Sequence, residues 1–291
     1  MFNMKKGMLF VFCILEKIKL NDSMTKMVIE APLVAKKAQA GQFIILRVNE
    51  KGERIPLTIA DYDAQSGTVT IIYQVVGKTT MLLDSLQKGD FILDFIGPLG
   101  KASDLNGYKK VAVIGGGAGC AIAYPQAKAL FKMGAEVDII AGFRNKSLII
   151  LKDEMEKVSS NLFIMTDDGS NGHKGFVTDA LKDRILNNAG YDFVIAIGPL
   201  PMMKAVCKLT KEYNIKTMVS MNSIMIDGTG MCGGCRLSVS GKTKFACVDG
   251  PDFDGHEVDF DEAIKRSVIY KKQEKEAREE YCRLFGGVDN A

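Results

Sequence analysis

The sequence of 291 residues contains no tryptophan and only two histidines. The sequence therefore offers few residues for a metal centre built from several histidines or for a catalytic triad that includes a histidine. No apolar run approaches the roughly 20 residues that a membrane-spanning helix needs. The net charge of only +3 gives no reason to expect nucleic acid or an anionic membrane as a partner. We therefore expect a cytoplasmic protein with neither kind of partner.

One segment near the N-terminus resembles a short signal peptide, because Lys5 and Lys6 precede the apolar run Met8–Leu15. That run is short, and no small-x-small cleavage site follows it. The residues Glu16–Leu20 then alternate between polar and apolar, which is typical of a strand. We expect the first strand of the fold here.

Cysteine is clustered, since Cys232, Cys235 and Cys247 lie within sixteen residues of one another. In a reducing compartment, grouped thiols bind a metal or an iron–sulfur cluster more often than they form disulfides. Plant-type [2Fe–2S] sites read C-x4-C-x2-C followed by a distant cysteine. Here the segment reads D-x4-C-x2-C-x11-C, with Asp227 in the place of the first cysteine. The pattern predicts a [2Fe–2S] cluster held by Asp227, Cys232, Cys235 and Cys247.

Two alternatives to this ligand set stay open. Three cysteines together with His256 also suit a structural zinc ion. An aspartate before glycine, as at Asp227, is in addition a common turn residue. The remaining cysteines are isolated in apolar or helical settings and are interpreted as small buried hydrophobic residues: Cys13, Cys120, Cys207 and Cys282.

The pattern of elements changes along the chain. Short alternating segments from residue 9 to about 100 predict a closed antiparallel barrel with a single helix at Thr79–Leu86. Strands and helices then alternate to about residue 220, which predicts a parallel sheet covered on both faces. Two short strands (Arg236–Ser240 and Lys244–Ala246) accompany the cysteines, and one charged helix is expected over Asp261–Phe285. The predicted fold class is thus β plus α/β, with domains at 1–102 (barrel), 103–221 (α/β), 222–260 (cluster) and 261–291 (helical tail).

Two glycine-rich turns in the α/β part each end a predicted strand and open a helix. The first contains Gly115, Gly116, Gly117 and Gly119, and the second contains Gly198, Pro199 and Met202. A bare backbone at a helix N-terminus lets phosphates approach, so the turns predict a dinucleotide site, with Arg144 as a partner for a ribose or its phosphate. Tight packing of strand on helix would also account for the glycines, and Arg144 is equally well a solvated charge.

The barrel carries a second set of candidates. Arg54 and Thr58 lie four residues apart around Pro56 and Leu57, and Tyr73 precedes the segment that opens the helix. An arginine beside a helix N-terminus with small hydroxyl residues suits a pyrophosphate, and the Thr58 hydroxyl or amide suits flavin N5. An ordinary helix cap is the alternative for the opening segment, which consists of Gly77, Lys78, Thr79 and Thr80.

In their order along the chain, these three parts resemble the ferredoxin–NADP⁺ reductase superfamily. Within it the chain resembles the electron-transfer subunits of dihydroorotate dehydrogenase, and more closely the small subunits of NADH-dependent reduced ferredoxin:NADP⁺ oxidoreductase. Aspartate at position 227 is expected of the second group and cysteine of the first. The flavin strand of the superfamily usually reads R-x-Y-S, whereas here Leu57 replaces the tyrosine and Arg54 comes one residue early. The residues that carry the resemblance are Arg54–Asp61, Gly97–Gly100, Thr166–Ser170, Gly198–Met203 and Asp227–Cys235.

The resemblance implies an electron-bifurcating oxidoreductase subunit with FAD in the barrel, NAD(H) on the glycine turns and a [2Fe–2S] cluster. It also implies a heterodimer with a larger subunit that holds a second FAD and [4Fe–4S] clusters, through which ferredoxin is reached. Because cofactors carry the chemistry, no catalytic residue is expected. Two other readings stay open: a subunit of NAD-dependent dihydroorotate dehydrogenase, and a zinc-stapled NAD(H) sensor without turnover.

Overall fold

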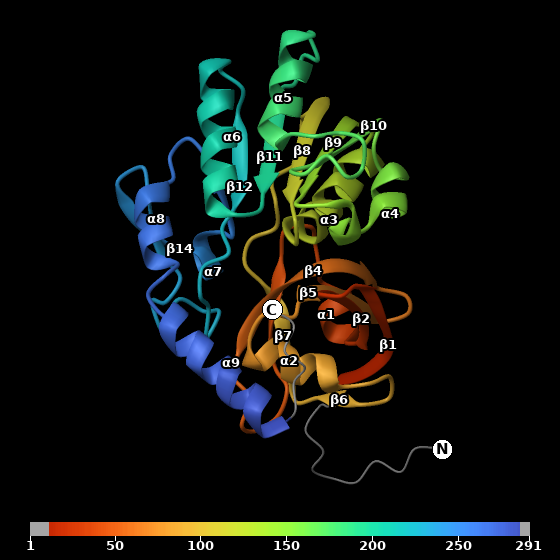
Figure 1. Ribbon diagram of the computed structural model, residues 1–291, viewed down its shortest axis with the longest axis vertical. Helices are drawn as coiled ribbons and strands as arrows, with labels where there is room; N and C mark the ends of the chain where they lie inside the picture. Colours follow the sequence, from red (N-terminus) through yellow and green to blue (C-terminus); the bar gives the residue numbers. More distant parts are fainter. Residues whose placement is uncertain (1–11, 286–291) are drawn as a thin grey trace.

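The computed structural model describes residues 12–285, and the first third of the chain is a β-barrel (Figure 1). Its strands are β1 (Phe12–Asn21), β2 (Met24–Glu30), β3 (Phe43–Arg47), β4 (Ile55–Asp63), β5 (Thr68–Gln74), β6 (Phe91–Ile92) and β7 (Asp94–Leu99). They form one antiparallel sheet in the order β6-β1-β2-β5-β4-β3-β7. Only Leu93 separates β6 from β7 along the chain, so the two edges of the sheet meet and the barrel is nearly closed. The predicted start of the first strand, at residues 8–11, lies outside the described residues, as do Lys5 and Lys6.

The barrel region contains a helix that the sequence pattern did not predict. Helix α2 (Lys78–Ser85) matches the expected one, but α1 (Pro32–Ala35) is additional, so the prediction of a single helix was wrong. Proline occupies the first turn of α1, and the Ala35 N–H donates to the Ala31 carbonyl at 2.9 Å. A helix of four residues is too short to produce a 3.6-residue hydrophobic period, and the pattern therefore missed it.

The middle of the chain forms a six-stranded sheet in the order β10-β9-β8-β11-β12-β15. Five strands are parallel, as predicted: β8 (Lys110–Gly116), β9 (Glu136–Phe143), β10 (Asn161–Thr166), β11 (Phe193–Ile197) and β12 (Thr217–Ser220). The sixth strand, β15 (Asp252–Asp254), runs antiparallel to β12 at the edge. This strand was not predicted, because three residues are too few to establish an alternating pattern.

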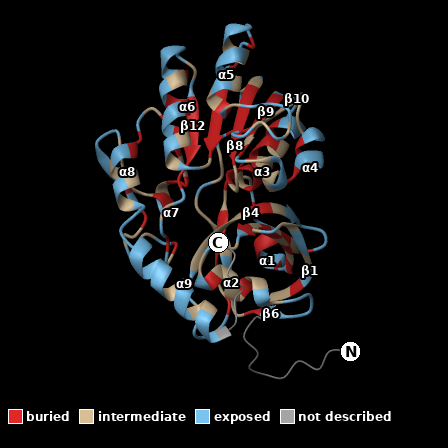
Figure 2. Ribbon diagram, in the orientation of Figure 1, coloured by how far each residue is buried: buried red, intermediate tan, exposed pale blue. Residues whose placement is uncertain are grey.

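Helices cover both faces of this sheet, as Figure 1 shows. The helices are α3 (Gly119–Lys132), α4 (Lys152–Glu156), α5 (Val177–Leu186) and α6 (Leu200–Glu212). Because side chains alternate along a strand, Val111 and Val113 of β8 share a core with α3 and α4. Ala112 and Ile114 share a different core with α5 and α6. Figure 2 shows the strands buried between these layers.

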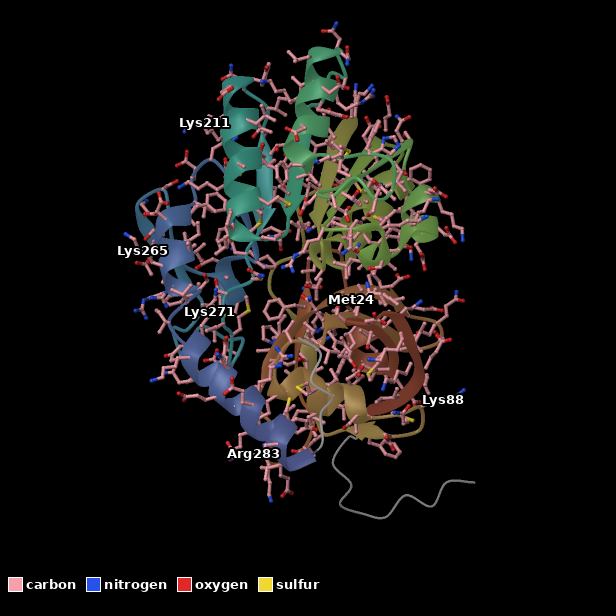
Figure 3. All side chains as sticks on the ribbon, viewed as in Figure 1. Met24, Lys88, Lys211, Lys265, Lys271 and Arg283 are labelled. Atoms are coloured by element: carbon pink, nitrogen blue, oxygen red, sulfur yellow. The ribbon has the colours of Figure 1, made fainter. Side chains whose placement is uncertain are left out.

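The C-terminal part holds a hairpin of β13 (Arg236–Val239) and β14 (Lys242–Phe245), followed by α7 (Ala246–Asp249). The predicted tail helix is interrupted, because α8 (Phe260–Arg266) and α9 (Lys271–Phe285) are separate. Helix α9 lies against α2 of the barrel. Figure 3 places Lys271 at its end near the hairpin and Arg283 at its far end. Within residues 12–285, no helix has the length and apolar character needed to cross a bilayer.

One hydrophobic core joins the three parts of the chain. It includes Phe43 and Ile45 of the barrel, Ile114 of the α/β sheet, and Cys235 and Cys247 of the C-terminal part. All five side chains are almost fully buried. The cysteine-bearing segment is therefore packed into the body of the protein, and its position relative to the barrel is fixed by shared packing.

Candidate functional site

The loop between β12 and β13 carries the first half of the predicted cluster motif, and Asp227 organises it. The Asp227 carboxylate accepts hydrogen bonds from the backbone N–H of Thr229 at 2.9 Å and of Cys232 at 2.7 Å. The bond from Thr229 is the largest of the effects that hold the pKa of Asp227 below its usual value. Asp227 thus acts as the turn residue that the sequence left as an alternative, and it is tied directly to the first cysteine of the motif.

Two of the predicted sulfur ligands lie together in the protein interior. The Sγ atoms of Cys235 and Cys247 are 3.3 Å apart, and the Cys247 N–H points at the Cys235 sulfur at 3.5 Å. Burial raises the pKa of Cys247, so this thiol needs a nearby cation to ionise. Cys232 lies on the exposed side of the same loop.

The potential ligands suit one kind of metal group better than another. Within the described part of the chain, no three His, Cys, Asp or Glu side chains converge on one metal position. Three thiols, two on the loop and one on α7, nevertheless supply the soft ligands that an iron–sulfur cluster requires, and one of them already accepts a backbone N–H. His256 is engaged elsewhere, with its Nε2 3.0 Å from the Thr210 hydroxyl. The arrangement therefore fits an iron–sulfur cluster better than a zinc ion that uses His256.

The cluster loop rests on the barrel at Gly228. This residue has φ +74°, and a methyl group there would lie 2.7 Å from Leu99 Cδ1 and 2.8 Å from Ile45 Cδ1. Only glycine adopts that backbone and allows this approach without strain. Ile45 pairs in register with Pro56, the centre of the predicted flavin strand. The loop and the flavin strand are thus separated by a single strand of the barrel.

The candidate flavin residues occupy the start of β4 and the helix beside it. Pro56, Leu57 and Thr58 are half-buried on β4, whereas Arg54 precedes the strand and is exposed. The Thr79 hydroxyl donates to Glu53 at 3.2 Å, which joins the start of α2 to the residue before Arg54. The structure therefore brings these two predicted elements together.

Several polar groups of this cradle are committed to local contacts. The Thr80 hydroxyl accepts the N–H groups of Val76 and Gly77, each at 3.0 Å, as an ordinary helix cap would. Arg54 lies 3.9 Å from Asp94, whereas Arg47 approaches the same carboxylate to 2.6 Å. Arg47, which ends the apolar strand β3 beside the flavin strand, was not among the predicted residues. Lys78 begins α2 next to the cap.

The side chain of Tyr73, another predicted cofactor-binding residue, points into the barrel core. Its side chain is 2% exposed in the barrel core, where its hydroxyl lies 3.4 Å from Asp84. Burial raises the pKa of this phenol well above its usual range. The buried ring is not available to a cofactor, so any role of Tyr73 in binding one would use its backbone, and its assignment as a binding residue stays a prediction.

The two glycine turns lie side by side, because β8 and β11 are adjacent and Ile197 pairs with Gly115. A methyl group on Gly198 would lie 3.1 Å from the backbone of Gly116, and one on Gly119 would collide with the Ile197 carbonyl. Met202 packs over Gly116, and Pro199 caps α6. Most of these glycines are thus required for close packing of the turns, as the alternative reading proposed.

The turns nevertheless form one edge that a dinucleotide can approach. A methyl group on Gly117 would meet no atom within 4 Å. Arg144 follows the neighbouring strand β9, and its side chain is exposed. Carboxyl ends of parallel strands form the ligand edge of open α/β sheets.

Two family models match the chain. A model of an oxidoreductase NAD-binding domain matches residues 113–208, and a model of the iron–sulfur cluster binding domain of dihydroorotate dehydrogenase B matches residues 222–259. These ranges contain the paired glycine turns and the cysteine segment, respectively.

Curated relatives match along most of the chain. A *Thermotoga maritima* protein named dihydroorotate dehydrogenase B (NAD(+)), electron transfer subunit homolog is 45% identical, over 94% of this chain and 96% of that protein. The electron transfer subunit of dihydroorotate dehydrogenase B (NAD(+)) from *Clostridium acetobutylicum* is 36% identical, over 84% of this chain and 94% of that protein.

Solved structures extend the likeness to the fold. One chain matches at TM-score 0.88 and 44% identity, over 94% of this chain and 99% of its own length. It comes from a structure of NADH-dependent reduced ferredoxin-NADP oxidoreductase described in terms of flavin-based electron bifurcation. The cytochrome b5 reductase domain of *Ulva prolifera* nitrate reductase shares the fold alone, at 19% identity and TM-score 0.57, over 70% and 92% of the two chains.

Proposed function

Because the chain belongs to the family of dihydroorotate dehydrogenase B electron-transfer subunits and their homologues, we propose a specific redox role for it. It is the small subunit of an electron-bifurcating NADH-dependent reduced ferredoxin:NADP⁺ oxidoreductase. It carries FAD, a [2Fe–2S] cluster and NAD(H), and it passes electrons between NADH and a larger subunit. The observation that carries the proposal is the match at TM-score 0.88 and 44% identity along 94% of the chain.

Each cofactor has residues suited to hold it. The turns around Gly117 and Gly198 would receive the NAD(H) pyrophosphate, with Arg144 at the ribose end. The half-buried stretch Pro56–Thr58 and the start of α2 would hold the flavin, with Arg47 or Arg54 near its phosphates. The three cysteine thiols and Asp227 would hold the cluster.

The chain's own residues orient and shield this chemistry. When bound, FAD exchanges a hydride with NADH, and the cluster carries single electrons. The contact of Gly228 with Ile45 holds the cluster loop one strand away from Pro56, which favours a short electron path. Backbone N–H groups at sulfur, such as that of Cys247, help to set the cluster potential.

The partner is the larger subunit with a second FAD and [4Fe–4S] clusters, and ferredoxin is reached through that complex. Around exposed Cys232 the surface is apolar, with Met231 88% exposed and Val248 44% exposed. A methyl group on Gly230 would lie 3.0 Å from Val248, so the loop and α7 form one patch. Exposed apolar patches mark protein contacts, and this patch favours docking beside the cluster.

The first test is anaerobic purification of the full chain, with flavin, iron and acid-labile sulfide assays and UV–visible and EPR spectra. Wild type is compared with Asp227→Cys and with Thr229→Cys, which adds a thiol to the same loop but keeps the carboxylate. We expect flavin and a reducible [2Fe–2S] signal that Asp227→Cys alone alters. A chain that contains neither flavin nor iron would refute the proposed function, whereas an unchanged signal in Asp227→Cys would remove Asp227 from the ligand set.

The relatives' names favour one second candidate, an electron-transfer subunit of an NAD-dependent dihydroorotate dehydrogenase. The cofactors are the same, so the partner decides between the two. A co-purified subunit that oxidises dihydroorotate would establish this candidate, and one that reduces NADP⁺ with ferredoxin would establish the first. Zinc without acid-labile sulfide would instead indicate the NAD(H) sensor.

A further inference from the structure

A polar cluster with buried acceptor atoms lies where the three parts of the chain meet. The Asp252 carboxylate, on β15, accepts hydrogen bonds from the Ser103 hydroxyl at 2.5 Å and from the Gln126 side-chain amide at 3.1 Å. Gln126 belongs to α3, and Ser103 to the segment that leads from the barrel to β8. The backbone of Gly41, from the barrel, packs directly against Ser103 and Asp252.

This cluster is short of hydrogen-bond donors. Asp252 Oδ1 and Gln126 Oε1 are buried acceptors without a partner. A buried acceptor without a donor costs free energy, and a proton on the carboxyl group supplies a donor. An ionised Asp252 is therefore poorly accommodated at this position, whereas a neutral one is better accommodated.

The surroundings of Asp252 within the described residues contain no compensating charge. The facing groups are the Ser103 hydroxyl, the Gln126 amide, the Gly41 backbone and Ser220, which is opposite Asp252 in the β12–β15 register. Asp254, on the same strand, is exposed and accepts the His256 N–H. Burial accordingly raises the pKa of Asp252 to about 6, although the hydroxyls of Ser103 and Ser220 lower it in part.

We propose that Asp252 is a positioning residue whose protonated form holds the nucleotide-binding sheet and the cluster segment against the barrel. Ionisation of Asp252 then loosens this junction. It also slows electron delivery from NADH to the flavin, and this second effect rests on the proposed function. The junction is otherwise closed by backbone bonds. The Lys101 N–H donates to the Gly250 carbonyl at 2.6 Å, and the Ser103 N–H donates to the Ala40 carbonyl at 2.9 Å.

The size of the effect follows from proton linkage. If the loosened junction returns Asp252 to its ordinary pKa, the equilibrium constant between the closed and the loosened junction changes with pH. It falls about tenfold, in favour of the loosened form, between about pH 5 and pH 8. Replacing Ser103 by alanine removes a donor to the carboxylate, so the midpoint of this change moves to higher pH. Asp252→Asn keeps the shape of the side chain without a titrating group, so it removes the change.

The test uses the full chain with its cofactors, kept anaerobic, across this pH range. Hydrogen exchange measures protection of the Lys101 and Ser103 amides, corrected for intrinsic rates, and stopped flow measures flavin reduction at saturating NADH. Wild type, Asp252→Asn and Ser103→Ala are compared with Asp254→Asn, which removes an exposed carboxylate from the same strand. In wild type and Asp254→Asn, we expect both the amide protection and the rate of flavin reduction to decrease as pH rises, by up to about tenfold. In Asp252→Asn, we expect both to stay constant across the pH range.

Two results would overturn the proposal. One is a fall in amide protection that is equal in wild type and Asp252→Asn. The other is a reduction rate whose pH profile is the same in both, even though amide protection differs. If NADH reduces no flavin in any variant, the proposed function fails, and the two amides still decide whether Asp252 controls the junction.

Discussion

The stability of the protein should depend on pH through Asp252, and Asp252→Asn isolates this dependence. The pKa of the folded state is about 6 and the ordinary value is 3.8. Each pKa unit corresponds to about 1.36 kcal/mol, so ionised Asp252 costs the folded state about 3 kcal/mol. Because the folded pKa is raised, stability is fully present below the unfolded pKa and is lost as pH rises through the folded one.

The variant should therefore gain stability over wild type as pH rises. The expected gain is about 0.5 kcal/mol near pH 4 and about 3 kcal/mol near pH 8, since asparagine imitates the neutral acid. Urea unfolding at several pH values measures it, with Asp254→Asn as the control that should follow wild type. An advantage that is constant with pH, or absent near pH 8, would refute the reasoning, because only a titrating group produces the slope.

Three further predictions concern the cofactor sites. Gly228→Ala should lower the iron content per chain, because a methyl group strikes the barrel; Gly241→Ala has a similar φ of +69° but open space, so it should retain iron. Tyr73→Phe should leave the flavin content unchanged and cost about 1 kcal/mol of unfolding free energy, as expected for one buried hydrogen bond. Gly119→Ala should separate the two glycine turns and weaken NADH binding at least about tenfold, measured by titration under anaerobic conditions. Loss of flavin in Tyr73→Phe, or unchanged NADH affinity in Gly119→Ala, would contradict these assignments.

The strand and turn patterns predicted the ligand edge of the α/β sheet. The strand–helix alternation indicates parallel strands, and each glycine turn follows the end of one of them. Parallel strands end at one edge, so Gly115 and Gly198 were expected at the same edge once each was placed after a strand. Their adjacency follows from the strand order, which puts β8 beside β11. The contact between Gly116 and Gly198 agrees with that reasoning. Alternation along β5 also places the Tyr73 side chain in the core, since it shares a face of the strand with Val69 and Ile71, both fully buried.

The junction around Asp252 could not be predicted in this way. Asp252, Gln126 and Ser103 are far apart in the sequence and come from a three-residue strand, a helix and a connecting segment. No local pattern relates such residues, because their proximity depends on how two sheets and a hairpin pack. The interruption between α8 and α9 also depends on tertiary packing, since α9 turns away to lie against α2.

At Asp227, acting as a turn residue does not exclude acting as a cluster ligand. A carboxylate has about four acceptor positions, and the N–H groups of Thr229 and Cys232 use two of them. The remaining capacity can serve an iron atom, while the two bonds hold the ligand in place, as outer hydrogen bonds do around other metal ligands. Asp227→Cys removes the carboxylate acceptor of the loop but supplies a thiolate ligand in its place, whereas Asp227→Asn keeps an acceptor for the loop and loses the anionic ligand. If Asp227 serves both roles, the asparagine variant should keep the loop's amide protection while its cluster signal changes.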